Sequence, residues 1–143
     1  ARRAEPDGAG TTGPVEHARL VGPRRRVLVV DDNVDAADSA AILLQLWGHE
    51  VETVYDGLGV LQAVRDFRPD VILLDIGLPG MTGYEVAQQL RAQPGLESVV
   101  LAAMTGYGQD DDRRRSREAG FNHHLTKPLD PERLHALIAS PPP

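Results

Sequence analysis

The chain has 143 residues, of which 41% are apolar and 25% are charged, and it contains no cysteine. This length suits one domain with a substantial core. The lack of cysteine excludes disulfides, thiolate zinc sites and cysteine nucleophiles, and no apolar run approaches the ~20 residues of a membrane span. These features predict a soluble, cytoplasmic protein without membrane contact.

Charge is distributed unevenly along the chain. Residues 1–26 carry six arginines against three carboxylates, whereas residues 27–143 carry nine basic side chains against eighteen acidic ones. An acidic region repels nucleic acid, so we expect no direct nucleic-acid binding. Residues 1–23 are rich in glycine and proline and show no apolar periodicity, which predicts a flexible linker or tail before one domain over residues 24–140.

Apolar patterning divides residues 27–139 into five strands that alternate with five helices. Short apolar runs such as Val27–Val30 are typical of strands covered on both faces, and apolar residues at helical spacing follow each strand. In chain order, the predicted elements are a strand at 27–30, a helix at 33–47, a strand at 51–55, a helix at 58–67, a strand at 71–74, a helix at 84–93, a strand at 99–104, a helix at 109–119, a strand at 121–126 and a helix at 131–139. This alternation predicts an α/β fold, a doubly wound parallel sheet with helices on both faces.

Polar side chains follow four of these strands at their carboxyl ends, where parallel sheets place their functional sites. They are Asp31 and Asp32 after the first strand, Asp75 after the third, Thr105 after the fourth and Lys127, the only lysine of the chain, after the fifth. Taken singly, each also suits a structural role, such as capping a helix or ending a strand. Three carboxylates at one edge repel one another unless a cation such as Mg²⁺ lies among them. The set therefore indicates metal-assisted transfer of a phosphoryl group to an aspartate, with an ammonium and a hydroxyl binding the phosphoryl oxygens.

Four motifs, in their order along the chain, resemble the receiver domain of two-component response regulators, and the resemblance covers residues 24–140. The motifs are Val27–Asn33, Leu73–Met81, Met104–Gly106 and Leu125–Pro128. The resemblance implies a five-stranded, flavodoxin-like sheet with strand order 2-1-3-4-5. It also implies a cis peptide bond between Lys127 and Pro128.

The same resemblance implies roles for individual residues. Asp75 is implied to be the phosphoacceptor. Mg²⁺ is implied to be bound by Asp32 directly, by Asp31 mostly through water, by Asp75 and by the carbonyl of Gly77. The residues implied to bind the phosphoryl group are Thr105, Lys127 and Gly106.

Two further roles, in switching and in docking, come with the resemblance. Thr105 is implied to switch together with the ring three residues before Lys127, where His124 replaces the commoner tyrosine or phenylalanine. Histidine titrates near neutral pH, so we hypothesise that its charge tunes the active population, which equal responses at about pH 6 and pH 8 would contradict. Ile42 and Leu46 lie on the predicted solvent side of the first helix, and we expect them to dock the helical bundle of a histidine kinase or histidine phosphotransfer protein.

The predicted function is that of a phosphoacceptor in a His–Asp phosphorelay. Residues 33–37, 106–109 and 119–125 look most like receivers at the carboxyl end of hybrid histidine kinases, and a stand-alone single-domain response regulator is the alternative. A Mg²⁺-dependent aspartate-nucleophile phosphatase would share the chemistry. The motif of such enzymes has two aspartates separated by one residue, whereas Asp31 and Asp32 are adjacent. Whether the self-phosphorylation and self-dephosphorylation of such a domain make it an enzyme stays open, and a monomer or weak dimer is expected.

Overall fold

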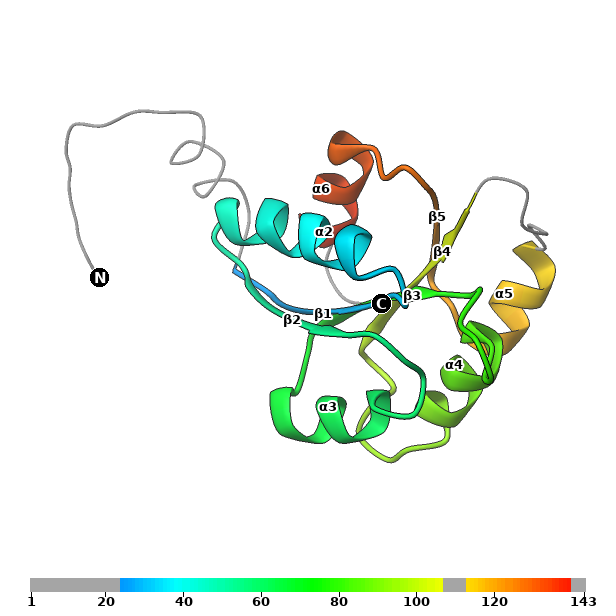
Figure 1. Ribbon diagram of the computed structural model, residues 1–143. Helices are drawn as coiled ribbons and strands as arrows, with labels where there is room; N and C mark the ends of the chain where they lie inside the picture. The colour runs from blue at the N-terminus through cyan, green and yellow to red at the C-terminus, as the bar shows by residue number, and fades with distance from the viewer. Residues whose placement is uncertain (1–23, 107–112, 140–143) are drawn as a thin grey trace, which may run out of the picture.

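The computed structural model describes residues 24–106 and 113–139, which form a parallel sheet covered by helices on both faces (Figure 1). The strands are β1 (Arg26–Val30), β2 (Glu50–Val54), β3 (Val71–Asp75), β4 (Val100–Thr105) and β5 (His123–Thr126). The helices are α2 (Val34–Leu46), α3 (Val60–Phe67), α4 (Gly83–Arg91), α5 (Arg113–Ala119) and α6 (Pro131–Ala139). The strand order β2-β1-β3-β4-β5 confirms the predicted fold class and topology.

Two apolar clusters, one on each face of the sheet, form the core. Alternate residues of a strand point to opposite faces, so Leu73 packs toward α2 and α6 while Leu74 packs toward α3 and α4. The first cluster includes Val29, Leu73, Ala37, Leu44 and Leu134, and the second includes Leu28, Leu74, Val64, Leu90 and Ala119. Figure 1 shows the same division, with α2 and α6 on one face and α3, α4 and α5 on the other. The double covering explains why the central strands read as continuous apolar runs.

Side-chain caps fix the starts of α2 and α4 near the carboxyl ends of β1 and β3. Asn33 Oδ1 accepts a hydrogen bond from the N–H of Ala36 at 3.1 Å and caps α2. Thr82 and Glu85 form a reciprocal capping box at the start of α4. Because these caps lie at the ends of the loops that follow β1 and β3, they restrict the conformations of those loops.

The first two residues of the predicted helix at 58–67 are not helical. Asp56 Oδ1 accepts the N–H of Gly59 at 2.9 Å, which holds residues 56–59 in a turn, and α3 begins only at Val60. Leu58 lies in this turn and is 83% exposed, so the predicted start of the helix at residue 58 is wrong. The other elements differ from the predicted bounds by a few residues at most, apart from the helix at 109–119.

Some expectations fall on residues outside the described part of the chain. The linker or tail at 1–23 and the first four residues of the helix at 109–119 lie there. The bond between Lys127 and Pro128 is cis, as the resemblance implies. Across the described residues, every helix is too short or too polar to cross a membrane.

Candidate functional site

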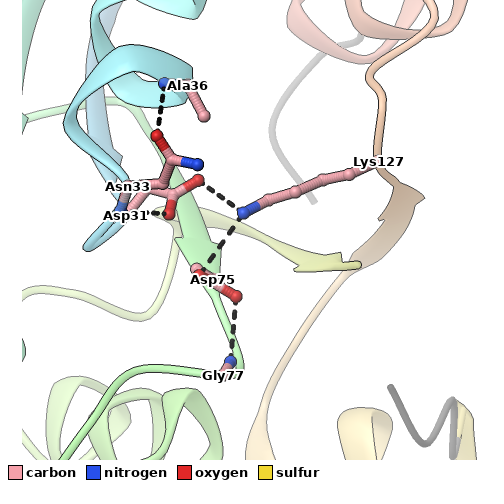
Figure 2. A network of polar contacts seen from close by, with 6 residues as sticks. All are labelled: Asp31, Asn33, Ala36, Asp75, Gly77 and Lys127. Atoms are coloured by element: carbon pink, nitrogen blue, oxygen red, sulfur yellow. Dashed lines mark hydrogen bonds and ion pairs between the residues drawn. The ribbon is translucent and has the colours of Figure 1, made fainter. Parts of the chain in front are cut away.

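Three strands deliver charged side chains to one edge of the sheet, as Figure 2 shows. Asp31 follows β1, Asp75 ends β3 and Lys127 follows β5. The sheet order places β1 beside β3, and Asp31 and Asp75 are only 2% and 4% exposed. The parallel topology therefore brings together residues that are up to 96 positions apart in the chain.

The ammonium group of Lys127 bridges the two buried carboxylates. Its Nζ lies 2.5 Å from Asp31 Oδ2 and 3.4 Å from Asp75 Oδ2. The backbone holds Lys127 in this position, because its N–H donates to the carbonyl of Thr105 at the end of β4. The contact with Asp31 is the shorter, so the ammonium does not pair with Asp75 alone.

Each carboxylate uses its second oxygen to fix its own loop. Asp75 Oδ1 accepts the N–H of Gly77 at 2.9 Å, and Asp31 Oδ1 accepts the N–H of Asn33 at 3.0 Å (Figure 2). These bonds orient both carboxylates, so that the Oδ2 atom of each points to Lys127.

Burial and like charge make Asp75 an unusual aspartate. Burial raises the pKa of Asp75, and the charge of Asp31 raises it further, while the Gly77 N–H and Lys127 offset only part of the rise. For Lys127, burial alone would lower the pKa, but the hydrogen bond and charge of Asp31 and the charge of Asp75 raise it above its usual value. Lys127 is therefore a cation, and the negative charge around it exceeds what one ammonium neutralises.

The donor set fits a hard divalent cation. Carboxylate oxygens of Asp31, Asp32 and Asp75 all lie within 4.8 Å of one another, and Asp32 is the exposed member. A metal ligated only by oxygens, with waters completing its shell, suits one exposed and two buried carboxylates. Gly77 is bonded to Asp75 through its N–H, which places its peptide at the same edge.

Thr105 and His124 form a separate pair beside this cluster. Thr105 is 1% exposed, and its Oγ1 lies 3.2 Å from His124 Nε2. Gly106, which follows Thr105, is half-buried. The structure thus brings Thr105 and His124 into direct contact, and the titration of His124 stays a prediction.

The two residues expected to dock a partner are exposed, as the helical pattern predicts. Ile42 and Leu46 are 58% and 44% exposed on α2. Asp31 and Asp32 belong to the acidic cluster and precede α2 by only a few residues. The helix that carries Ile42 and Leu46 therefore begins beside this cluster.

Gly83 is a site residue that the sequence pattern did not reveal. A Cβ there would lie 2.5 Å from Ile76 Cα and 2.6 Å from the carbonyl oxygen of Asp75, so only glycine fits. Its N–H donates to the carbonyl of Ile76 at 3.1 Å, which packs the start of α4 against the loop that follows β3. A glycine in the first turn of a strongly capped helix was the available signal, since glycine lowers helix propensity there.

The fold and this edge of the sheet define a receiver domain. The model of the response regulator receiver domain family matches residues 27–139, and the chain belongs to that family. It is 39% identical over 115 residues to the DNA-binding response regulator MtrA of Mycobacterium tuberculosis, covering 80% of this chain and 49% of MtrA. It is 31% identical to the DNA-binding dual master transcriptional regulator RpaA of Synechocystis, covering 79% of this chain and 47% of RpaA. The chain thus spans about half the length of these curated relatives.

Solved structures agree with the family. The chemotaxis response regulator CheY4 of Vibrio cholerae superposes with a TM-score of 0.74 at 30% identity, covering 81% of this chain and 97% of CheY4. The receiver domain of the Pseudomonas aeruginosa sensor histidine kinase PA1611 has a TM-score of 0.72 at 29% identity, over 81% of this chain and 95% of that domain. That domain holds a magnesium ion in its active-site cleft. Residues 27–139 therefore form a receiver domain of two-component signalling.

The relatives correct two expectations. The expectation of no direct nucleic-acid binding is wrong, because MtrA and RpaA are DNA-binding regulators. The acidic charge describes the receiver part alone, and that part is only about half of each of these proteins. The same matches favour the response-regulator alternative over an origin in a hybrid histidine kinase.

Proposed function

We propose that this receiver domain belongs to a response regulator and accepts a phosphoryl group on Asp75, with Mg²⁺ bound at the neighbouring carboxylates. The observation that carries the proposal is the Lys127 ammonium between two buried carboxylates, one of which is Asp75. Such an arrangement is costly for folding alone, because it leaves negative charge buried beyond what one cation offsets. It is useful where a ligand brings both positive charge and phosphoryl oxygens.

The proposed reaction is an in-line displacement at phosphorus. A carboxylate oxygen of Asp75 forms a bond to the phosphorus atom while the bond from phosphorus to the donor's leaving atom breaks, and that atom, an oxygen in acetyl phosphate and a ring nitrogen in a phosphohistidine, keeps the electron pair. Lys127 balances charge on the phosphoryl oxygens. Thr105 and the N–H of Gly106 bind those oxygens, and the Gly77 N–H keeps Asp75 oriented.

We propose that Asp31, Asp32, Asp75 and the carbonyl of Gly77 hold Mg²⁺. When bound, the ion supplies positive charge beside the phosphoryl oxygens and offsets the repulsion between the carboxylates. Asp32→Asn removes the exposed ligand without burying a new group. We expect Mg²⁺ to raise the unfolding temperature of the unsubstituted protein and to raise that of Asp32→Asn much less; equal shifts would contradict the metal site.

Acetyl phosphate provides the direct test of the acceptor. With Mg²⁺ and acetyl phosphate, mass spectrometry is expected to show one phosphoryl group on the unsubstituted chain and none on Asp75→Asn. Asp70→Asn is the matched control, because Asp70 lies at the opposite end of β3, and it is expected to be modified normally. No modification of the unsubstituted chain, or equal modification of Asp75→Asn, would overturn the proposal.

We further propose that Ile42 and Leu46 contact the protein that supplies the phosphoryl group. Both are exposed apolar residues on α2, the helix that starts beside the acidic cluster. Truncation to alanine is expected to slow transfer from a phosphorylated histidine phosphotransfer domain and to leave the acetyl phosphate rate unchanged. Gln45→Ala, on the same helix, is the control and should affect neither; slowing of both reactions by the Ile42 and Leu46 variants would contradict docking.

A further inference from the structure

The contact between Thr105 and His124 joins two neighbouring strands next to the acceptor site. In the β4–β5 register, Thr105 pairs with Thr126 and Ala103 pairs with His124, so the two side chains lie diagonally on one face of the sheet. Water barely reaches Thr105, which is 1% exposed. Its hydroxyl therefore depends on partners within the protein, and His124 Nε2 at 3.2 Å is one of them.

This hydrogen bond can run in either direction. A threonine hydroxyl has one hydrogen to donate and lone pairs that accept, whereas a ring nitrogen either carries a hydrogen or offers a lone pair. The direction between Thr105 and His124 is consequently decided by whatever else takes the hydrogen of Thr105.

A phosphoryl group on Asp75 would decide it. Phosphoryl oxygens only accept hydrogen bonds, so a Thr105 hydroxyl that binds one must give up its single hydrogen to it. The contact with His124 then persists only if Nε2 carries a hydrogen. The Nε2–H tautomer and the imidazolium both meet this requirement, and the Nδ1–H tautomer does not.

We propose that His124 is a positioning residue: in the phosphorylated protein its Nε2–H donates to Thr105 Oγ1 and aims the Thr105 hydrogen at the phosphoryl group. This inference rests on the proposed function, because it needs a phosphoryl group on Asp75. It gives the histidine a role that a phenylalanine ring in its place would lack. The role lies in orienting Thr105 and not in touching the reacting atoms.

A double-mutant cycle tests the coupling. Affinity for beryllofluoride, an acceptor-only stand-in for the phosphoryl group, is measured with Mg²⁺ for the full chain, His124→Phe, Thr105→Val and the double variant. We expect His124→Phe to weaken binding about fivefold, as loss of one hydrogen bond does, and less than about twofold in the Thr105→Val background. His124→Gln, which keeps an N–H donor, should stay within about twofold of the unsubstituted protein. Equal losses from His124→Phe in both backgrounds would overturn the inference, since a packing role does not depend on the Thr105 hydroxyl.

Nitrogen NMR of the His124 ring tests the same inference on the unsubstituted chain. With beryllofluoride and Mg²⁺ bound, the Nε2 signal is expected to be that of a nitrogen carrying hydrogen. A lone-pair Nε2 in that state would overturn the inference while leaving phosphorylation of Asp75 intact. If the unsubstituted chain neither binds beryllofluoride nor becomes phosphorylated, the proposed function fails, and the role of His124 fails with it.

Discussion

The two ends of the sheet both carry charged side chains, but they use them in opposite ways. At the amino end, the N–H of Arg26 donates to Asp70 Oδ2 at 2.9 Å and Arg26 Nε donates to the carbonyl of Phe67 at 2.8 Å. The same guanidinium lies 4.3 Å from the centre of the Phe67 ring. At the carboxyl end, Asp31 and Asp75 are buried around a single ammonium.

The difference separates charges that stabilise the fold from charges that we propose bind a ligand. The amino-end contacts are complete within the protein, so removing one weakens the fold. The carboxyl-end carboxylates repel each other, so the fold bears them at some cost to its stability. Substitutions of charged residues at the amino end should therefore affect stability more than phosphorylation. Substitutions of charged residues at the carboxyl end should affect phosphorylation more than stability.

Gly83→Ala should have the largest effect, because it would displace the backbone at the carboxyl end of β3. The new Cβ would overlap Ile76 Cα and the Asp75 carbonyl, both of them backbone atoms that cannot rotate away. We expect a loss of about 3 kcal/mol in the free energy of unfolding, at the upper end of overpacking costs, together with loss of phosphorylation. Urea unfolding and the acetyl phosphate reaction measure the two effects.

Gly80→Ala is the control for that substitution. Gly80 has φ of +80° and open space around its missing Cβ, so alanine there meets only backbone strain. We expect a loss of about 1 kcal/mol with phosphorylation retained. Equal losses at the two glycines would show that the close contact of Gly83 with the loop after β3 is unimportant.

Arg26→Ala should have the next largest effect, on stability alone. It removes charged hydrogen bonds to the Phe67 carbonyl and the contact with the Phe67 ring. We expect a loss of about 2 kcal/mol and an unchanged rate of phosphorylation by acetyl phosphate. Arg65→Ala, an exposed arginine on α3, should leave both unchanged, and a slowed reaction in Arg26→Ala would break the separation of the two ends.

Asp75→Asn should stabilise the metal-free protein. Burial raises the pKa of Asp75, which means that the folded state disfavours its charge, and the amide removes that charge while keeping an oxygen for the Gly77 N–H. We expect a gain of about 1 kcal/mol in urea unfolding with EDTA present. At the amino end, Asp70→Asn should bring no such gain, because Asp70 is exposed and asparagine also keeps an oxygen for the Arg26 N–H. A loss of stability in Asp75→Asn would mean that its charge stabilises the fold.

Most of the fold and the acidic cluster could be predicted, because both follow from patterns along the chain. Apolar runs mark the buried strands, and parallel strands bring residues such as Asp31 and Asp75 to one edge. Leu58 was misplaced because the Asp56 side chain holds a turn where apolar spacing indicates a helix. The bond between Thr105 and His124 depends on the register of β4 and β5, which no local pattern specifies.

The last effect depends on pH and lies at the amino end. His49 is 8% exposed, and its Nδ1 accepts the N–H of Arg25 at 2.9 Å. Burial lowers the pKa of His49, and the charges of His135, Arg25 and Arg24 lower it further. The unfolded chain therefore takes up a proton near pH 6.5, while the folded protein resists it until a lower pH.

The sign of the pH effect follows from this difference in proton binding. The contribution of His49 to stability is fully present above its unfolded pKa and is lost as the pH falls below about 6.5, by at most about 1.4 kcal/mol per pH unit. His49→Gln keeps an acceptor for the Arg25 N–H but does not titrate. Urea unfolding at about pH 7.5, 6.5 and 5.5 should show the unsubstituted protein losing stability faster than His49→Gln, whereas His123→Gln, at an exposed position on β5, should follow the unsubstituted protein. Parallel curves for the unsubstituted protein and His49→Gln would mean that the amino end tolerates a charged His49. That result would contradict the view that the polar contacts at the amino end are complete within the protein.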